Sequence, residues 1–227
     1  DFSWEGRPLK LVDTAGLRRK ARIDERLEKL SVADTLNALR FAEIVVLVVD
    51  VHQPFETQDL QIADLVEREG RAMVVAVNKF DEIEDKAKTL RILRSRIDEL
   101  LPQWRGVPVI AVSALSGEGI DRLMPALFAQ NEIWNKRVST GQLNRWLEEA
   151  LTRHAPPAAK GRRIKIRYMT QAKARPPTFA LFVSQAGELP DDYVRYLVNG
   201  LREAFGFDGV PMRLNLRAGK NPYADKA

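Results

Sequence analysis

The sequence predicts an α/β protein in which a doubly wound, mostly parallel sheet is followed by a smaller α+β domain. Three observations lead to this prediction. Short apolar runs alternate with amphipathic helical segments up to residue 135, this alternation stops after Trp134, and the charge balance reverses at the same point. Strict alternation of strand and helix is typical of right-handed βαβ units. We therefore expect two domains, residues 1–135 and 136–227.

In the first domain, the expected strands are apolar throughout, as is typical of strands buried on both faces of a parallel sheet. These strands are Leu9–Val12, Ile44–Asp50, Ala72–Val77 and Val107–Val112. The segments between them have helical spacing, with helices expected near Glu25–Arg40, Thr57–Glu69, Asp85–Leu101 and Gly119–Asn135. Ligands of such sheets bind at the carboxyl ends of the strands.

The second domain has the order helix, strand, strand, helix, strand. Ser139 and Gln142 form a potential capping box at the start of the first helix. The later elements are expected at Arg163–Met169, at Phe179–Ser184, after Pro190, and at Met212–Arg217. A short α+β domain with one sheet and its helices on one side has this order.

The two expected domains have opposite net charge. Residues 1–135 carry 19 basic and 23 acidic side chains, net −4, whereas residues 136–227 carry 17 and 8, net +9. Alternation in two strands of the second domain predicts an apolar inner face, with Tyr168 turned inward, and an outer row of cations. Such a face suits a phosphate backbone. The candidate RNA or partner contacts are Arg163, Lys165, Arg167, Arg213 and Arg217.

Composition excludes several classes of function. The chain has no cysteine, which excludes disulfides, thiolate chemistry and cysteine-ligated metal. No apolar run reaches the roughly 18 residues that cross a bilayer, and residues 1–5 lack the features of a signal peptide. We expect a monomeric cytoplasmic protein with no membrane contact.

Polar motifs follow three of the expected strands. Asp13-Thr14-Ala15-Gly16 follows the first strand, Asn78-Lys79-Phe80-Asp81 the third, and Ser113-Ala114-Leu115 the fourth. Asp81 suits guanine, because one carboxylate accepts both adjacent N–H donors of that base. Adenine offers an acceptor at N1 and has no N2 amine, so it leaves the carboxylate unpaired. A polar site denied its partner can reject a ligand by roughly 10⁴-fold or more.

In this order, the three motifs resemble the DxxG, NKxD and SAx motifs of P-loop GTPases. The resemblance implies that Asn78 holds guanine N7, that Lys79 lies along the base or ribose, and that the N–H of Ala114 meets O6. Ser113 would shape that loop, which Leu115 completes.

At the phosphate end, the resemblance implies that Asp13 reaches Mg²⁺ through water and that the N–H of Gly16 approaches the γ-phosphate, with Thr14 and Ala15 in the same loop. Leu17 stands where many small GTPases have a glutamine that orients water. The resemblance then implies another catalytic group, either a bound K⁺ or one that a partner supplies.

The sequence contains no phosphate loop of the form GxxxxGK[ST]. We expect the first strand, this loop and the first switch of a GTPase to lie outside the chain, and these residues alone to bind GTP poorly. The stretches "KLVDTAGLRRK", "VNKFD", "VSALSGEGI", "KIRYMTQAKARPPTF" and "GFDGVPMRL" resemble the Der (EngA) family of tandem-G-domain GTPases. That resemblance implies GTP or GDP as ligand, a KH-like second domain, and GTP-dependent assembly of the large ribosomal subunit.

Three alternatives remain open at this stage. An Era-like GTPase acting on the small subunit should show a basic GxxG loop between two helices, whereas Gly206-Phe207-Asp208-Gly209 is acidic, precedes a strand and is interpreted as a helix stop with a turn. The second alternative is a non-catalytic RNA- or protein-binding module. The third is a membrane-associated GTPase, which the absence of an amphipathic or apolar anchor disfavours.

Overall fold

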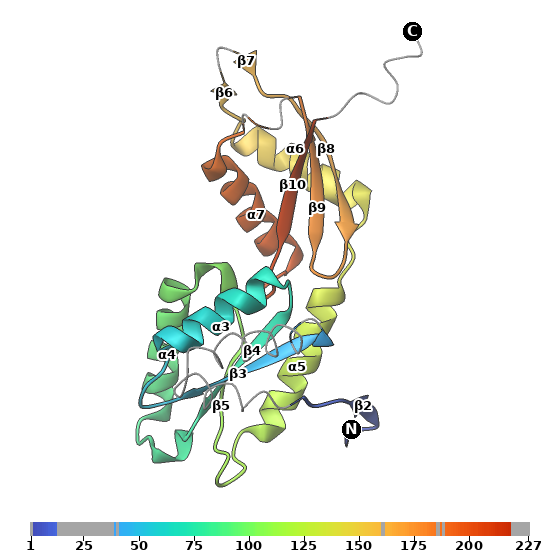
Figure 1. The fold of residues 1–227 in the computed structure, drawn as a ribbon. Helices are drawn as coiled ribbons and strands as arrows, with labels where there is room; N and C mark the ends of the chain where they lie inside the picture. Colours follow the sequence, from blue (N-terminus) through green and yellow to red (C-terminus); the bar gives the residue numbers. More distant parts are fainter. Residues whose placement is uncertain are drawn as a thin grey trace, which may run out of the picture.

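The computed structural model describes residues 2–12, 39, 41–159, 162–184, 187 and 189–218. The expected site residues Asp13, Thr14, Ala15, Gly16 and Leu17 lie outside the described residues. So does the helix expected at Glu25–Arg40, apart from Leu39. Figure 1 shows two sheets, each with its own helices, stacked end to end and joined where α5 leads into α6.

The first sheet has the order β3-β4-β5, and its strands are parallel. The elements of this half are β3 (Ile44–Asp50), α3 (Thr57–Arg68), β4 (Ala72–Asn78), η1 (Phe80–Glu82), α4 (Lys86–Leu100), η2 (Pro102–Trp104), β5 (Val109–Ala111) and α5 (Ile120–Asn135). Helices α3 and α4 pack on the face that carries Met73, Val75 and Val77, and α5 packs on β4 from the other side. The doubly wound parallel sheet is therefore confirmed.

The strand expected at Leu9–Val12 is wrong. Instead, β1 (Phe2–Trp4) and β2 (Arg7–Leu9) form an antiparallel hairpin of their own. Glu5 and Gly6 both have positive φ, as a tight two-residue hairpin turn requires. Leu11 and Val12 are exposed. Local hairpin pairing satisfies the backbone here, whereas a place in the parallel sheet needs a distant partner strand.

The second half has the expected order of helices and main strands. Its elements are α6 (Thr140–Arg153), β6 (Ala158–Ala159), β7 (Arg162–Arg163), β8 (Ile166–Lys173), β9 (Thr178–Val183), α7 (Asp191–Phe205) and β10 (Arg213–Ala218). The sequence did not predict the short hairpin that β6 and β7 form. The sheet order is β10-β9-β8, with β10 parallel and β8 antiparallel to β9. Helices α6 and α7 pack on one face of this sheet, through Leu143, Leu197 and Leu201 among others.

Local chemistry explains how α6 is placed on the sheet. The capping box is confirmed, since Ser139 Oγ accepts from the N–H of Gln142 and the Gln142 side chain accepts from the N–H of Ser139. One turn later, Asn144 pairs its side-chain amide with both the N–H and the carbonyl of Met169, over 2.9 and 3.0 Å. This pairing satisfies the backbone at the edge of β8.

The inward orientation expected for Tyr168 is wrong. A register shift between Ile166 and Tyr168 inserts an extra residue into β8, so that Tyr168 pairs with Phe182 and Met169 pairs with Leu181. Met169 and Leu181 are fully buried, whereas Tyr168 is 37% exposed. A bulge of this kind reverses the alternation of side chains beyond it.

The two halves meet at the end of α3, where Trp134 of α5 packs in the core of the second half. Trp134 Nε1 donates to the carbonyl of Gly70 over 2.9 Å, and both groups are buried. From β10, Arg213 Nη2 donates to the carbonyls of Arg68 and Glu67, over 2.6 and 3.3 Å. A guanidinium is well suited to the carbonyls that a helix leaves unpaired at its carboxyl end.

The segment Gly206–Gly209 belongs to the same junction. Gly206 caps α7 in the left-handed conformation, which confirms the interpretation as a helix stop with a turn. The Phe207 side chain is fully buried, and the N–H of Gly209 donates to the carbonyl of Arg105 over 2.9 Å. A GxxG loop that binds RNA presents its backbone to the nucleic acid, whereas this one is turned toward the first half of the protein.

Candidate functional site

Polar side chains collect at the carboxyl ends of β3, β4 and β5, as the sequence predicts. The register pairs Asp50 at the end of β3 with Asn78 at the end of β4. Ser113 follows β5, and the N–H of Phe80 donates to the carbonyl of Val112. These contacts bring the loop that begins at Asn78 together with the loop that begins at Ser113.

Asn78 ties the two loops together. Its Oδ1 accepts from the backbone N–H of Ala114 over 2.9 Å. Asn78 is half-buried at the strand end, so its side chain is held on a rigid element. Among the residues that the structure describes, its amide nitrogen has no acceptor and can donate to a ligand. The structure thus shows a direct link between the two loops through the side chain of Asn78.

Asp81 presents an exposed carboxylate in the first turn of η1. Its pKa lies below the ordinary value, chiefly because the Ser113 side chain hydrogen bonds to the carboxylate, while partial desolvation opposes the shift. The nearby Lys86 ammonium forms its own ion pair with Glu118 at 2.8 Å. Asp81 is thus ionised near neutral pH and accessible to a ligand that offers N–H donors.

Lys79 adopts the left-handed conformation, with φ of 61°, directly before η1. Its Nζ lies 2.6 Å from Asp50 Oδ2. The hydrogen bond to Asp50 raises the pKa of Lys79, and the same bond is the main cause of the lowered pKa of Asp50. Asp50 was missed in the sequence, although it is the polar residue at the carboxyl end of β3 and the rule that found Asn78 applies to it equally.

The third motif forms a tight loop between β5 and α5. Ser113 is fully buried and its Oγ accepts from the N–H of Ser116 over 3.1 Å, whereas Leu115 is 91% exposed. The loop ends at Gly119, which has φ of 82° and whose Cβ, if present, would lie 2.1 Å from the Ala111 carbonyl oxygen. Only glycine allows α5 to begin this close to β5.

The five cations expected on the outer face of the second sheet do not form a single surface in the structure. Lys165, Arg167 and Arg217 are exposed, and the side chain of Arg163 lies outside the described residues. Arg213 is also exposed, but its guanidinium contacts α3 at the junction. The available cations therefore lie toward the end of the sheet that is distant from the first half.

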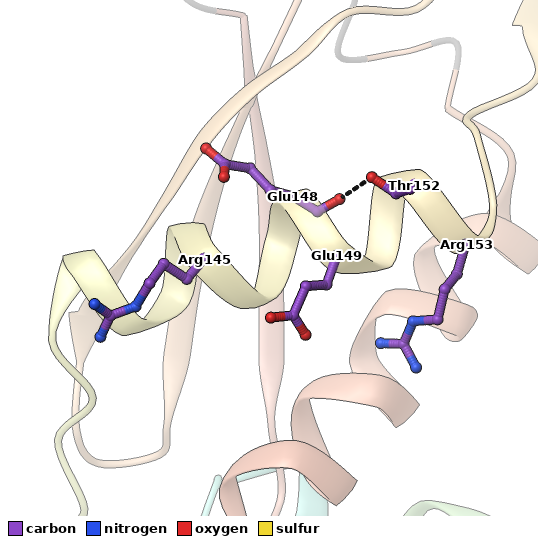
Figure 2. Close-up of a pocket in the computed structure, with 5 residues that line it drawn as sticks. All are labelled: Arg145, Glu148, Glu149, Thr152 and Arg153. Atoms are coloured by element: carbon purple, nitrogen blue, oxygen red, sulfur yellow. Dashed lines mark hydrogen bonds between the residues drawn. The ribbon is translucent and has the colours of Figure 1, made fainter.

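A shallow hollow of about 560 Å³ lies along α6. Figure 2 shows its five lining residues, all from this one helix: Arg145, Glu148, Glu149, Thr152 and Arg153. Among them, Thr152 Oγ1 donates to the carbonyl of Glu148 over 2.8 Å. Because all of its lining residues come from one face of one helix, this hollow cannot enclose a ligand. It also shares no residue with the cluster at the strand ends.

The described residues contain neither a cluster of metal ligands nor a membrane-spanning helix. In that part of the chain, no group of three or more histidine, cysteine, aspartate or glutamate side chains is arranged to hold a metal ion. Nor does the same part contain a helix that is long and apolar enough to cross a bilayer.

Comparisons with known proteins agree with the geometry of both halves. The family model of the elongation factor Tu GTP-binding domain matches residues 1–132, and that of the C-terminal KH-domain-like region of EngA bacterial GTPases matches residues 137–217. The GTPase Der of Parvibaculum lavamentivorans is 56% identical over 226 residues, which is all of this chain and 48% of the relative. This chain belongs to the Der (EngA) family.

The relatives of this Der-family chain are longer than it is. The GTPase Der of Brucella melitensis is also 56% identical, over 227 residues, and the match covers 47% of its length. The chain thus spans about half the length of the curated relatives it matches. Among solved structures, Aquifex aeolicus Era bound to GDP and AlF4⁻ is 16% identical, with 84% of this chain and 69% of that chain covered and a TM-score of 0.41.

Proposed function

We propose that this chain forms the base-binding part of a protein that binds and hydrolyses GTP. The observation that carries the proposal is the exposed carboxylate of Asp81, which Ser113 holds in its ionised form beside the loop of Ala114. A carboxylate in this position accepts the two adjacent N–H donors of guanine. Asn78 and Lys79 would border the base, while Ser113, Ala114 and Leu115 form the loop over its O6 edge.

The geometry adds one condition to this proposal. The N–H of Ala114, expected to donate to guanine O6, already donates to Asn78 Oδ1. When guanine binds, this N–H must be shared between the two acceptors or move from one to the other. Nucleotide binding would therefore change the contact between Asn78 and Ala114, which an amide chemical shift can report.

The phosphate end of the proposal rests on residues outside the described part. Asp13, Thr14, Ala15, Gly16 and Leu17 would border the phosphates, with Asp13 as an indirect ligand of Mg²⁺. Bound Mg²⁺ would neutralise charge on the phosphates. Because Leu17 offers no hydrogen bond to water, we expect K⁺ or a partner group to assist hydrolysis. A higher turnover in K⁺ than in Na⁺ would support the ion, and equal turnover would favour the partner.

The most specific test of the base site changes the residue at position 81 and the base of the nucleotide together. Xanthine has a carbonyl where guanine has its second N–H donor, so Asp81→Asn should lose affinity for GTP and gain affinity for XTP. The full-length natural protein should show this reversal in competition titrations. A matched control, Asp98→Asn on the exposed surface of α4, should leave both affinities unchanged. Equal binding of ATP and GTP by the unaltered protein would overturn the proposal.

We further propose that the complete protein acts in assembly of the large ribosomal subunit. The support is the net charge of +9 in residues 136–227, which suits an RNA-rich partner. Co-sedimentation in the presence of a non-hydrolysable GTP analogue tests this proposal. Binding to the large subunit is the expected result, whereas binding to the small subunit alone would favour the Era-like alternative. GTP-independent binding without hydrolysis would indicate a non-catalytic module.

A further inference from the structure

The sheet of the second half has one covered and one open face. Helices α6 and α7 pack against the face that carries Met169, Leu181 and Val183. Because side chains alternate along strands, Phe182 of β9 and Arg217 of β10 point to the opposite face. In the part of the chain that the structure describes, contact with this opposite face comes from α3 through Arg213, at the end of the sheet near the junction.

At the far end of the open face, three side chains form a row across the strands. The register pairs Tyr168 with Phe182 on one side and Arg217 with Phe182 on the other. The rings of Tyr168 and Phe182 are stacked, with centroids 4.2 Å apart and planes 10° from parallel. Tyr168 is 37% exposed, and Arg217 is also exposed. The bulge in β8 is what turns Tyr168 to this face, so an aromatic ring that could have joined the core is at the surface instead.

The charge around this row has a single sign. The segments 162–184 and 213–218 contain no acidic residue. Of the cations in these segments, Lys165, Arg167 and Arg217 are exposed at this end of the sheet. Arg213 and Arg175 instead contact α3 and Glu43 near the junction. A flat aromatic pair within a field of cations complements a partner that carries both planar rings and negative charges, and single-stranded nucleic acid has both.

Duplex RNA fits this surface less well. Its bases are already stacked on one another, so they cannot continue the stack of Tyr168 and Phe182. An unpaired base can lie against the aromatic pair while its phosphates contact Arg217 and Arg167. The surface is also separate from the Gly206–Gly209 turn, which packs at the junction and has Phe207 fully buried.

We propose that the row of Tyr168, Phe182 and Arg217 binds single-stranded RNA, by stacking of an unpaired base on the aromatic pair and by phosphate contacts to the surrounding cations. This inference deepens the proposed function, on which it rests for the presence of an RNA-rich partner. It assigns to the open sheet face the RNA contact that the Gly206–Gly209 turn does not provide.

The test measures binding of short labelled oligonucleotides to the full chain by fluorescence anisotropy. The probes are oligoadenylate, an abasic strand of equal length, and a duplex of equal length. We expect oligoadenylate to bind most tightly. Tyr168→Leu should weaken oligoadenylate binding by about tenfold or more, the typical effect of losing one base–aromatic stack. Tyr168→Phe keeps the ring and should retain binding.

Arg217→Gln tests the phosphate contact separately. It should weaken binding of oligoadenylate and of the abasic strand to a similar extent and reduce the slope of log affinity against log salt by about one. Two matched controls should have no such effect: Arg153→Gln on α6, which lies on the covered side, and Phe41→Leu, whose ring is 87% exposed in the first half. Thermal unfolding midpoints of all variants, compared with that of the unaltered chain, identify any variant that loses binding through unfolding.

Three results would overturn the inference. They are equal affinity for oligoadenylate and the abasic strand, unchanged affinity in Tyr168→Leu, and no binding of any oligonucleotide, which would assign the surface to a protein partner. The Asp81→Ala variant of the full-length natural protein separates this inference from the proposed function. It should lose guanine binding and keep oligonucleotide binding, so that failure at either site can be recognised on its own.

Discussion

Asn78 Oδ1 accepts a hydrogen bond from the backbone N–H of Ala114, over 2.9 Å, and so joins the loops that follow β4 and β5. The bond links two segments 36 residues apart in the sequence. Together with the backbone hydrogen bond from the N–H of Phe80 to the carbonyl of Val112, it holds the two loops side by side.

We expect Asn78→Ala to weaken guanine-nucleotide binding by about tenfold, since a lost hydrogen bond of this kind is worth roughly 1–2 kcal/mol. The loss has two physical causes. The loop of Ala114 is no longer held in place, and the donor for guanine N7 disappears. Titration with a fluorescent GDP analogue measures the effect in the full-length protein.

The control for this variant is Asn199→Ala, which removes an exposed asparagine from α7. Its nucleotide affinity should equal that of the unaltered protein. If Asn78→Ala also binds normally, the link between the loops has no part in the site.

The ionisation of Asp81 should depend on Ser113. The hydrogen bond from Ser113 is the main cause of the lowered pKa of Asp81, so Ser113→Ala should move that pKa back toward its ordinary value of 3.8. A lowered pKa means that the stabilising hydrogen bond is present above pH 3.8 and is lost as the pH falls through the lowered value. Carboxyl-carbon NMR titration of Asp81 measures this shift.

Guanine affinity should follow the same ionisation. Affinity should be independent of pH from neutral down to about 5, because the carboxylate stays charged over that range. Ser116→Ala is the matched control, since Ser116 Oγ accepts from the N–H of Glu118. If Ser116→Ala shifted the pKa of Asp81 as much as Ser113→Ala did, Ser113 could not be the main cause of the lowered pKa.

The sequence was sufficient for those features that depend on local pattern. The strand Ile44–Asp50 has the bounds expected from its apolar run, and the capping box of Ser139 forms as its spacing indicates. The clustering of Asn78 and Ser113 also follows from pattern, because parallel strands bring their carboxyl ends to one edge of the sheet.

Features that depend on pairing between distant segments could not be predicted in the same way. Residues 9–12 have a strand-like composition, but composition does not say whether a partner strand is available, and the local hairpin forms instead. The orientation of Tyr168 depends on a bulge whose position is set by pairing with β9. The strand-end rule applies to Asp50, but its pairing with Lys79 is known only from the 2.6 Å contact.

Trp134→Phe should weaken the connection between the two halves, because the Trp134 ring, at the end of α5, packs in the core of the second half while its Nε1 is anchored to Gly70 of the first half. The substitution keeps most of the apolar volume but leaves the buried carbonyl of Gly70 without its 2.9 Å hydrogen bond. Leaving such a group unsatisfied costs about 1–3 kcal/mol. We expect urea unfolding, followed by circular dichroism, to show a larger difference between the unfolding midpoints of the two halves than in the unaltered chain.

Trp104→Phe provides the matched control. Trp104 Nε1 donates to the carbonyl of Ala63 over 3.1 Å, within the first half. Its loss should lower the stability of that half by a similar amount and leave the second half unchanged. If both variants affected the halves equally, the bond of Trp134 would have no special part in coupling them.

Gly70→Ala should disrupt the junction by a different route. Gly70 has φ of 68°, and a Cβ there would lie 2.7 Å from Pro176 Cγ, in the loop between β8 and β9. Both the unfavourable backbone conformation and the collision oppose the substitution, so we expect a loss of more than about 1 kcal/mol in the free energy of unfolding. Gly141→Ala, in the first turn of α6, has open space around the new methyl group. Because alanine favours a helix over glycine, that variant should gain up to about 1 kcal/mol. Urea unfolding of both variants gives the comparison, and a Gly70→Ala protein as stable as the unaltered chain would show that the two halves are not held together through Gly70 and Pro176.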